Sequence, residues 1–455
     1  MKKIPSPHRP LTLSPTLLLT FFIAILVLAS CSIDPDSLYR DLRDHADKIK
    51  VINTHEHQHQ LSDYGNMKFG FWPLVAISYL SADLASAGAK PYDPEKVKTM
   101  STDELWDLYG NDLDHTRNTS YYSQFAEGFR KLYGFSEWYF TKANVKDLSA
   151  RIGKNYEDYP KWFDESFKKC GYEVMILDQY WKPLNTDIDT SHFALAFNIG
   201  FVVSGASRRP LKLPGVTADR TVTGQPLDLD DYLRSCDELF RMNVEKHAVC
   251  IKNSMAYQRT LYYEDVPYDE AKELFMKKEL SQAEAKKIED YIFHYIIKKA
   301  TEYNLPVQVH TGYLAGSGNT LENGNPLNLN NLFLEYPHTK FILFHGGFPW
   351  TGECAALAKM FPNVYLDLVW LPQISRQEAV NALDVMLDCV PYNKFCWGGD
   401  CQLIEESAGA LEFAKDVVSE VLANRIKRGL MNRELAEEIM DGIFRENAMK
   451  IFALK

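Results

Sequence analysis

The sequence predicts an α/β protein: a (β/α)8 TIM-like barrel with a large helical insertion after its first strand. Eight short, mostly apolar runs between residues 49 and 400 are typical of buried parallel strands. Segments with helical periodicity separate most of these runs from residue 230 onward. Four runs end at or just before a residue that binds metals: His55, His310, His345 and Asp400. Because the carboxyl ends of barrel strands meet at one rim, we expect these four side chains to converge.

The first thirty residues have the features of a bacterial signal peptide. A basic start precedes an apolar stretch over 17–28, and the tetrapeptide LASC at 28–31 resembles a lipobox. We therefore expect a signal peptide over 1–30 and a lipidated Cys31, which would anchor a soluble body over 31–455 to the cell envelope. Ser32 favours the outer membrane. A plain secretory signal with a chance cysteine is the alternative.

Charge and cysteine content narrow the classes of partner. Residues 1–30 hold three basic and no acidic side chains, so their removal changes the net charge from −11 to −14. An acidic body argues against binding to nucleic acid or anionic lipid. The seven cysteines after Cys31 show no disulfide framework, and we expect them to be small buried residues. A zinc-thiolate role for Cys396 and Cys401 is disfavoured because no CxxC pair is present.

The predicted elements follow in order along the chain. Residues 34–49 are expected to form a helix, 49–54 the first strand and about 61–163 the insertion, whose many aromatic residues are expected to be mostly core. The other strands are expected at 172–177, within 194–203, at 247–251, before His310, before His345, at 364–368 and before Asp400. The later helices are expected at 230–243, 284–304, 327–336, 351–361, 377–390, 403–427 and 432–452. Residues 312–330 are expected to form a long rim loop, and no glycine-rich phosphate-binding fingerprint follows the first strand.

His55 and His57 are spaced to face one ion. Side chains two residues apart on a strand point the same way, so both imidazoles would face the barrel axis and Glu56 would point toward the helix layer. His59 continues this period but lies beyond the strand, and we interpret it as a loop histidine. The pair alone is weak evidence, since a hydrogen-bonded histidine at a strand end is common.

The distant residues make a metal site the better interpretation. His310 and His345 directly follow apolar runs, and Asp400 follows Gly398-Gly399, where missing side chains leave room for close approach. Each residue alone has an ordinary structural explanation, such as a helix N-cap for Asp400. Together they supply nitrogen and oxygen ligands suited to Zn²⁺ or another divalent metal.

These residues resemble the pattern of the amidohydrolase superfamily. His55-x-His57 after strand one, His310, His345 and Asp400 after strands five, six and eight carry the resemblance, which spans about residues 48–453. The motifs NTHEH at 53–57, HGGFP at 345–349, Gly399-Asp400 and RENA at 445–448 point to the amidohydrolase-related (amidohydrolase 2) branch. The segment around Lys252 is similar to the amidohydrolase half of fungal FluG-type proteins.

The resemblance implies a metal-activated water. His55, His57 and Asp400 would hold the ion, with His310 as a further ligand, and one ion is favoured over two. A bound cation lowers the pKa of its water, and Asp400 would take the proton and pass it to the leaving group. His345 would polarise the substrate carbonyl or stabilise the oxyanion.

Lys252 decides the number of metal ions. In binuclear relatives the equivalent lysine is carboxylated and bridges two ions, and His310 and His345 would then bind the second ion. The alternative is a lysine that pairs with a substrate carboxylate or a nearby acid. Tyr257 and Arg259 are candidates for a substrate anion site.

Four functions remain open from the sequence. The leading hypothesis is hydrolysis of an amide, ester or lactone of a small substrate. The alternatives are a non-oxidative decarboxylase, a uronate-isomerase-like activity and a lipoprotein that keeps the fold only as a binding module. Partners would be a small-molecule substrate and the membrane through Cys31, but not nucleic acid; oligomerisation is left open.

Overall fold

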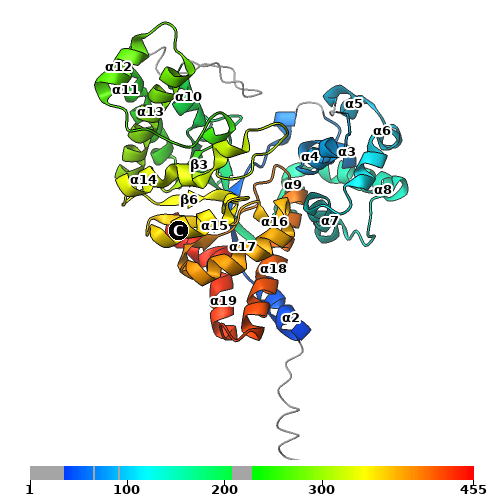
Figure 1. Ribbon diagram of the computed structural model, residues 1–455. Helices are drawn as coiled ribbons and strands as arrows, with labels where there is room; N and C mark the ends of the chain where they lie inside the picture. The colour runs from blue at the N-terminus through cyan, green and yellow to red at the C-terminus, as the bar shows by residue number, and fades with distance from the viewer. Residues whose placement is uncertain (1–34, 65–66, 91–92, 208–227, 455) are drawn as a thin grey trace, which may run out of the picture.

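A computed structural model describes residues 35–64, 67–90, 93–207 and 228–454. Its centre is an eight-stranded parallel sheet in which neighbours along the chain are neighbours in space (Figure 1). The strands are β1 (Val51–Glu56), β2 (Tyr172–Asp178), β3 (Phe193–Asn198), β4 (Cys250–Asn253), β5 (Val307–Val309), β6 (Phe341–Leu343), β7 (Val364–Asp367) and β8 (Phe395–Cys396). This arrangement confirms the predicted (β/α)8 barrel.

The segment after β8 closes the barrel against β1. Thr54 N donates to Trp397 O at 3.1 Å, and Asp400 N donates to His55 O at 2.8 Å. Closure depends on two glycines, because a Cβ at Gly398 would lie 2.8 Å from His55 N and one at Gly399 would lie 2.1 Å from Glu56 Oε1. The close approach expected at Gly398-Gly399 is therefore present.

Helices cover the outside of the barrel (Figure 1). They are α2 (Pro35–Ala46), α10 (Gly200–Ala206), α11 (Leu229–Glu245), α12 (Tyr268–Met276), α13 (Gln282–Glu302), α14 (Asn330–Glu335), α15 (Thr351–Met360), α16 (Leu371–Ile374), α17 (Arg376–Cys389), α18 (Ile404–Lys427), α19 (Arg433–Asp441) and α20 (Asn447–Ile451). Short 3-10 turns are η1 (Leu61–Tyr64), η2 (Met255–Tyr257), η3 (Leu321–Gly324), η4 (Pro326–Leu329), η5 (Phe344–Gly347) and η6 (Tyr392–Lys394), and η7 (Gly442–Glu446) is a π-helix.

Two predicted segments contain more than one element. Within residues 194–203, where we expected a strand, β3 ends at Asn198, whose Oδ1 accepts a bond from Gly200 N at 3.0 Å, and helix α10 begins at Gly200. The predicted helix 432–452 is divided by the π-helix η7. The amide of Asn447, just after η7, donates to Phe395 O at 2.9 Å and so ties this turn to β8.

The insertion between β1 and β2 is helical, as predicted, and its helices extend to residue 170 (Figure 1). They are α3 (Phe71–Ile77), α4 (Leu80–Ser86), α5 (Pro94–Thr99), α6 (Thr102–His115), α7 (Ser120–Tyr133), α8 (Lys142–Tyr156) and α9 (Tyr159–Cys170). Its aromatic residues are mainly core, since Phe71, Phe125, Phe129 and Phe140 are all buried, although Trp138 is 82% exposed.

The insertion is packed tightly on α18. A Cβ at Gly128 of α7 would lie 2.0 Å from Glu405 O, and one at Gly409 of α18 would lie 2.0 Å from Gln124 O. The two helices therefore touch backbone to backbone where they cross. This contact fixes the insertion above the carboxyl end of β8.

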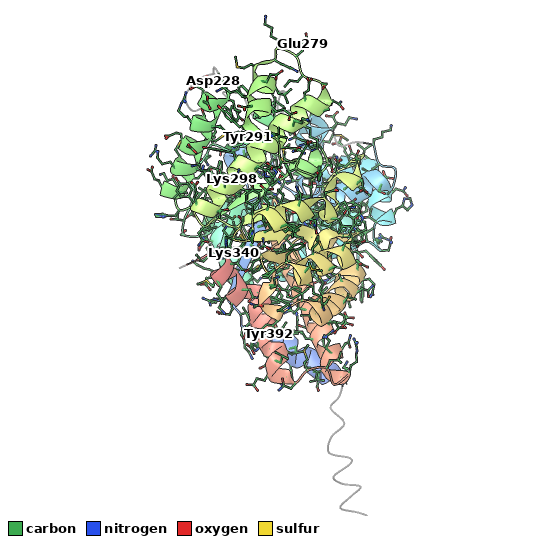
Figure 2. All side chains as sticks on the ribbon, turned by 60° about the vertical axis from the view of Figure 1, so that its left-hand side comes forward. Asp228, Glu279, Tyr291, Lys298, Lys340 and Tyr392 are labelled. Atoms are coloured by element: carbon green, nitrogen blue, oxygen red, sulfur yellow. The ribbon has the colours of Figure 1, made fainter. Side chains whose placement is uncertain are left out.

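The C-terminal helices close the opposite end of the barrel. Lys340, just before β6, donates to Ile451 O at 3.1 Å, and the hydroxyl of Tyr392, just before β8, donates to Glu438 Oε1 at 2.7 Å (both labelled in Figure 2). These contacts leave the carboxyl ends of the strands as the accessible rim.

The predicted signal peptide and Cys31 lie outside the described residues. Within the described part of the chain, no helix has both the length and the apolar character needed to span a bilayer. The seven other cysteines are free thiols, and all but the partly exposed Cys389 are buried, as expected.

Candidate metal centre

Polar side chains from all eight strand ends gather at one rim of the barrel. They are His55 and His57 (β1), Asp178 (β2), Asn198 (β3), Lys252 (β4), His310 (β5), His345 (β6), Asp367 (β7) and Asp400 (β8). All but His57 are less than a tenth exposed. Burying so many polar groups is costly unless they bind one another or a ligand, so this cluster indicates a functional site.

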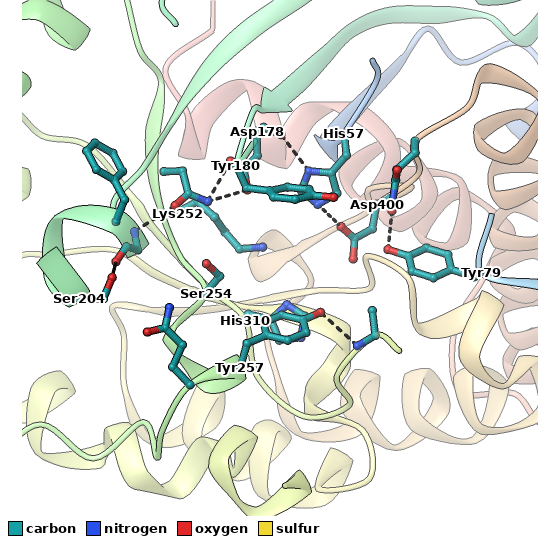
Figure 3. Close-up of a pocket in the computed structure, with 16 residues that line it drawn as sticks. His57, Tyr79, Asp178, Tyr180, Ser204, Lys252, Ser254, Tyr257, His310 and Asp400 are labelled. Atoms are coloured by element: carbon teal, nitrogen blue, oxygen red, sulfur yellow. Dashed lines mark hydrogen bonds and ion pairs between the residues drawn. The ribbon is translucent and has the colours of Figure 1, made fainter. Parts of the chain in front are cut away.

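Asp400 lies close to the histidines, and its contact with His57 is drawn in Figure 3. Its Oδ1 is 3.0 Å from His57 Nε2 and 3.5 Å from His55 Nε2. Its Oδ2 is 4.0 Å from His345 Nε2, and His345 Nε2 is 3.2 Å from His310 Nδ1. The structure therefore brings together all four histidines and the aspartate that the sequence singled out.

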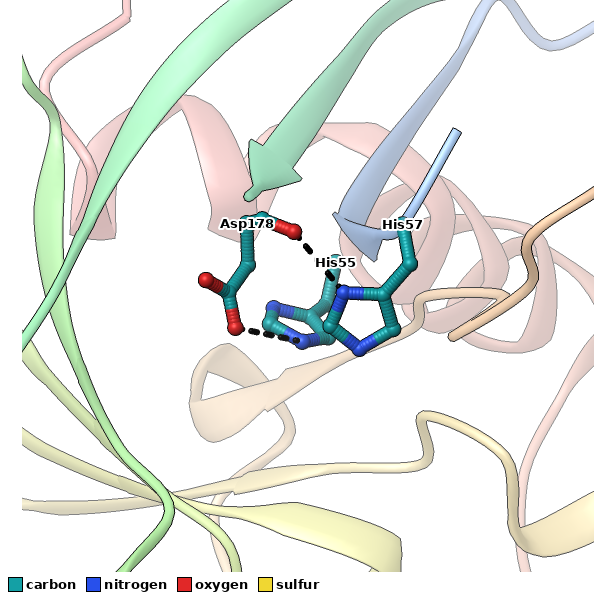
Figure 4. A group of neighbouring side chains, drawn as sticks. All are labelled: His55, His57 and Asp178. Atoms are coloured by element: carbon teal, nitrogen blue, oxygen red, sulfur yellow. Dashed lines mark hydrogen bonds and ion pairs between the residues drawn. The ribbon is translucent and has the colours of Figure 1, made fainter. Parts of the chain in front are cut away.

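Asp178 is a site residue to which the sequence analysis gave no role. Its Oδ2 is 3.8 Å from His55 Nε2, and the ligand atoms of His55, His57 and Asp178 all lie within 4.8 Å of one another (Figure 4). Asn198 Nδ2 donates to both carboxylate oxygens, at 3.0 and 3.1 Å. The signal was present in the sequence, because Asp178 also ends an apolar strand.

Each β1 histidine has one ring nitrogen fixed by a carbonyl oxygen. His57 Nδ1 donates to Asp178 O at 2.8 Å. His55 Nδ1 donates to Gln308 Oε1 at 3.2 Å, and Gln308 Nε2 donates to Thr54 O at 2.8 Å, which orients the amide. In the neutral imidazoles both Nε2 lone pairs therefore face Asp400 and Asp178.

The histidines of β5 and β6 are fixed in the same way. His345 Nδ1 donates to Val369 O at 2.9 Å, which leaves the Nε2 lone pair facing the centre. His310 Nε2 donates to Tyr313 O at 2.9 Å, which leaves Nδ1 facing His345. Carbonyl acceptors that hold the second nitrogen are a usual companion of metal-binding histidines.

Burial keeps most of these imidazoles neutral. Burial, with the charge of Lys252, holds the pKa of His55 well below its usual value and lowers the pKa of His345 to about 3. Burial and the neighbouring His345 hold the pKa of His310 well below its usual value. Neutral imidazoles are the form that binds a metal.

His57 and Asp400 form a pair whose pKa values shift in opposite directions. Burial opposes charge on both groups, but their mutual contact prevails, so the pKa of His57 is raised and that of Asp400 is lowered. Asp400 is therefore a carboxylate, which can accept a proton or bind a cation.

The spacing of these atoms fits a small divalent cation. Ligands about 2.1 Å from a tetrahedral ion lie roughly 3.4 Å apart. The distances of 3.0 and 3.5 Å from Asp400 Oδ1 to the β1 histidines are close to this value. The donor set of imidazole nitrogens and carboxylate oxygens supports a divalent metal cofactor.

Lys252 lies beside the same histidines. Its Nζ is 3.2 Å from His55 Nε2 and 4.0 Å from the centre of the Phe344 ring, and the residue is 2% exposed. Burial lowers the pKa of Lys252, although Asp400 and Asp178 partly oppose the shift. The amine is thus within reach of the centre, as the sequence predicted.

The backbone is strained where three strands end. His345, Trp370 and Asp400 have φ values of 61°, 60° and 60°, in the left-handed region that residues with a side chain rarely adopt. Strain of this kind costs of order 1–3 kcal/mol per residue and clusters at functional sites. Here it turns His345 and Asp400 into the barrel mouth.

A cavity of about 670 Å³ opens above the centre and is a suitable size for a small organic substrate. Besides His57, Asp178, Lys252, His310 and Asp400, its lining includes Tyr79, Tyr180, Asn198, Phe201, Ser204, Ser254, Tyr257, Gln258 and Gln402. Tyr257, a predicted substrate residue, lies beside His310 with the two ring centres 4.7 Å apart. Tyr79, from the insertion, donates to Asp400 O at 2.7 Å.

Arg259 does not lie where we expected. It is absent from the cavity lining, and its guanidinium pairs with Glu289 at 2.8 Å and with Asp290 at 2.7 Å, both on α13. A cation already paired with two buried carboxylates is not available to a substrate anion. Its position instead holds the loop that carries Tyr257 and Gln258.

Comparison with known families agrees with this site. The amidohydrolase family model matches residues 263–454, the part of the chain that carries His310, His345 and Asp400. With the barrel and its buried donor set, this match supports an enzyme of the amidohydrolase type. It supports a metal-dependent hydrolase and leaves the identity and number of the ions open.

One curated relative is similar over part of the chain. The Protein fluG of Emericella nidulans is 32% identical over 158 residues, which make up 34% of this chain and 18% of that protein. The match therefore spans less than a fifth of the relative's length.

Several solved structures share the fold. The glucuronate isomerase of Caulobacter crescentus has a TM-score of 0.74 at 16% identity, covering 93% of this chain and 95% of its own. The uronate isomerase of Thermotoga maritima has a TM-score of 0.73 at 14% identity, covering 91% and 97%. A protein described as a metal-dependent hydrolase, from Lactobacillus casei, has a TM-score of 0.62 at 15% identity, covering 90% and 97%. At these identities the likeness shows the fold alone.

Proposed function

We propose that this protein is a metal-dependent hydrolase that cleaves an amide, ester or lactone of a small substrate. One observation carries the proposal: four imidazoles, each fixed at one nitrogen by a carbonyl, direct their other nitrogen toward a space shared with Asp400. Burial lowers the pKa of three of these imidazoles, those of His55, His310 and His345. Unprotonated ring nitrogens grouped with a carboxylate suit a divalent cation.

The residues of the centre divide into holding and proton-moving roles. His55, His57, His310 and Asp400 would hold one divalent ion, which when bound lowers the pKa of a water molecule and polarises a carbonyl. Asp400, a carboxylate in contact with His57, would accept the proton of the attacking water and deliver it to the leaving group.

The hydrogen bond of His345 refines its proposed role. Because Nδ1 donates to Val369 O, the neutral ring has no proton on Nε2 to offer an oxyanion. We therefore favour His345 as a further ligand or proton acceptor. Two ions per chain would instead assign His310 and His345 to a second ion, with Lys252 between the two.

The test begins with metal content. Elemental analysis of the purified chain should find about one divalent ion, and removal by a chelator should abolish hydrolysis of a panel of N-acyl amines, esters and lactones. Restored hydrolysis on adding Zn²⁺ or Mn²⁺ supports the proposal. A metal-free protein whose properties do not change with chelator would instead indicate a binding module.

A uronate-isomerase-like activity is the second candidate, because two solved structures that share this fold are uronate isomerases. A hexuronate is an anion, and the described residues that line the cavity include Lys252 but no arginine. Hydrolysis is therefore placed first. Interconversion of a hexuronate would favour the isomerase, and release of CO₂ from an aromatic acid would favour a decarboxylase.

We also propose that the mature chain is anchored to the bacterial envelope through lipidated Cys31, with the outer membrane favoured. The support comes from the tetrapeptide LASC after the apolar stretch. Labelled palmitate incorporation that is lost in Cys31→Ser tests this; an unlabelled wild-type chain would refute it.

A further inference from the structure

A second cavity adjoins the first on the side of the insertion. It measures about 350 Å³ and lies between the end of α3, helix α4 and the loop after β5. Its lining is Ala76, Ile77, Ser78, Tyr79, Ser81, Ala82, Ala85, Ala89, Lys90, Ala315, Gly316, Ser317 and Gln402.

The two cavities share three lining residues, and these lie beside the centre. Tyr79, Ala315 and Gln402 line both. Tyr79 donates to Asp400 O, and Ala315 N donates to the Tyr257 hydroxyl at 3.1 Å. In Figure 3, Asp400 lies between Tyr79 on one side and Ser204 on the other. The backbone of Asp400 is therefore near the junction of the two cavities, and Asp400 also lines the first.

The two linings differ in chemistry. The first is rich in hydroxyl, amide and aromatic groups, among them Ser204, Ser254 and Gln258. The second is formed mainly by alanines, serines and a glycine, with the exposed Lys90 at its edge. Small side chains leave room for a slender group, and an anion at the far end of such a group would meet Lys90.

We propose that the substrate has two arms: a polar arm in the first cavity and a slender aliphatic arm with an anionic end in the second, joined by the scissile bond near Asp400. This inference rests on the proposed hydrolase function and deepens it. A compact substrate such as a single sugar acid would fit in the first cavity and leave the second unused. The arrangement suits an acyclic amide or ester better than a small lactone.

The test measures binding of hydroxamates, which chelate divalent ions through a small common head. Acetohydroxamate is compared with derivatives that carry a hexyl or a 5-carboxypentyl arm, placed on the nitrogen in one series and on the acyl carbon in the other. Calorimetry on the metal-loaded mature chain should give, in one series, about tenfold tighter binding for the carboxypentyl compound than for acetohydroxamate, or roughly 1.4 kcal/mol.

Three variants separate the parts of this effect. Ala82→Phe should fill the second cavity and remove the gain from both arms while acetohydroxamate binds as before; Ala85→Phe at the more exposed position of α4 is the second variant if Ala82→Phe does not fold. Lys90→Met should remove only the advantage of the carboxylate over the methyl end. Lys96→Met, on neighbouring α5 and outside the cavity, is the control and should change nothing.

The outcomes distinguish the two proposals. If acetohydroxamate does not bind, the metal-dependent function fails. If it binds but neither series gains from an arm, or the gain survives the cavity-filling variants, the two-arm substrate is wrong. A gain that is unchanged in Lys90→Met would overturn the anionic end of the aliphatic arm.

Discussion

Two buried carboxylates, Asp400 and Glu405, are five residues apart and have opposite surroundings. Glu405, on α18, reaches into the insertion, where Oε1 accepts from the Tyr133 hydroxyl at 2.8 Å and from Trp162 Nε1 at 2.9 Å. Its Oε2 accepts from the Tyr156 hydroxyl at 2.9 Å. Glu405 is thus surrounded by neutral donors and closed off from the cavities.

Asp400 instead shares its space with imidazole nitrogens, of which His57 Nε2 lies 3.0 Å away. These nitrogens are candidate metal ligands, and the Asp400 backbone has φ of 60°, whereas Glu405 lies in a regular helix. A carboxylate whose acceptors are all filled by donors stabilises a fold. A carboxylate that shares its space with other acceptors requires a cation or a substrate, and this difference separates structure from function here.

The most severe test of this comparison removes one of the histidines that surround Asp400. His55→Ala should lose its metal and reduce kcat/KM roughly 1,000-fold, because the ion and its activated water are lost together. Circular dichroism should show a folded chain. His59→Ala is the control, since His59 stacks on Trp181 beyond the strand and should keep the metal. Retained turnover in His55→Ala would contradict the site.

A change at Glu405 should instead alter the stability of the fold. Glu405→Gln replaces one acceptor by a donor among three donors, and it should lower the free energy of unfolding by about 1–3 kcal/mol in urea titrations. Metal content should stay the same. Glu165→Gln, at an exposed position on α9, is the control. Loss of metal from Glu405→Gln at unchanged stability would remove the distinction between Glu405 and Asp400.

Removing a carbonyl group that fixes a histidine should have a smaller effect on metal binding. Gln308→Leu removes the acceptor that fixes His55 Nδ1 and should weaken metal binding about 10- to 100-fold in chelator competition. Gln377→Leu, on the exposed side of α17, should not change it. Equal affinities in Gln308→Leu and the parent would show that the histidine orientation does not depend on this bond.

The smallest expected effect is on the pH dependence of stability. Burial raises the pKa of Glu406 to about 8, while Tyr79 N donates to its Oε1 at 2.8 Å. Between its usual pKa near 4.5 and 8, the folded chain keeps a proton that the unfolded chain has lost, so stability falls as pH rises. Unfolding of chelator-treated protein from pH 5 to 8 should show a smaller decline in Glu406→Gln. If the decline keeps the same size in Glu406→Gln, it belongs instead to Glu56 and Asp367, whose pKa values burial raises to about 7.

Much of this site was predictable because its ligands end strands. His55, His57, His310, His345 and Asp400 each follow a short apolar run, and the carboxyl ends of parallel strands meet at one rim. Asp178 has the same signal, but its role depends on the orientation that Asn198 imposes. The prediction for Arg259 was wrong because its partners, Glu289 and Asp290, lie on a helix some thirty residues away. A pairing of this kind leaves no local pattern in the sequence.

The sequence by itself determined the barrel, the helical insertion and the candidate metal ligands, because strand periodicity and strand ends are local properties of the chain. Only the tertiary structure decided which ring nitrogen of each histidine faces the centre, that Tyr79 of the insertion reaches Asp400, and that two cavities meet there. The physical reason is that these features depend on hydrogen bonds and packing that form only in the folded chain. Some of them join segments hundreds of residues apart, such as His55 with Gln308 and Tyr79 with Asp400.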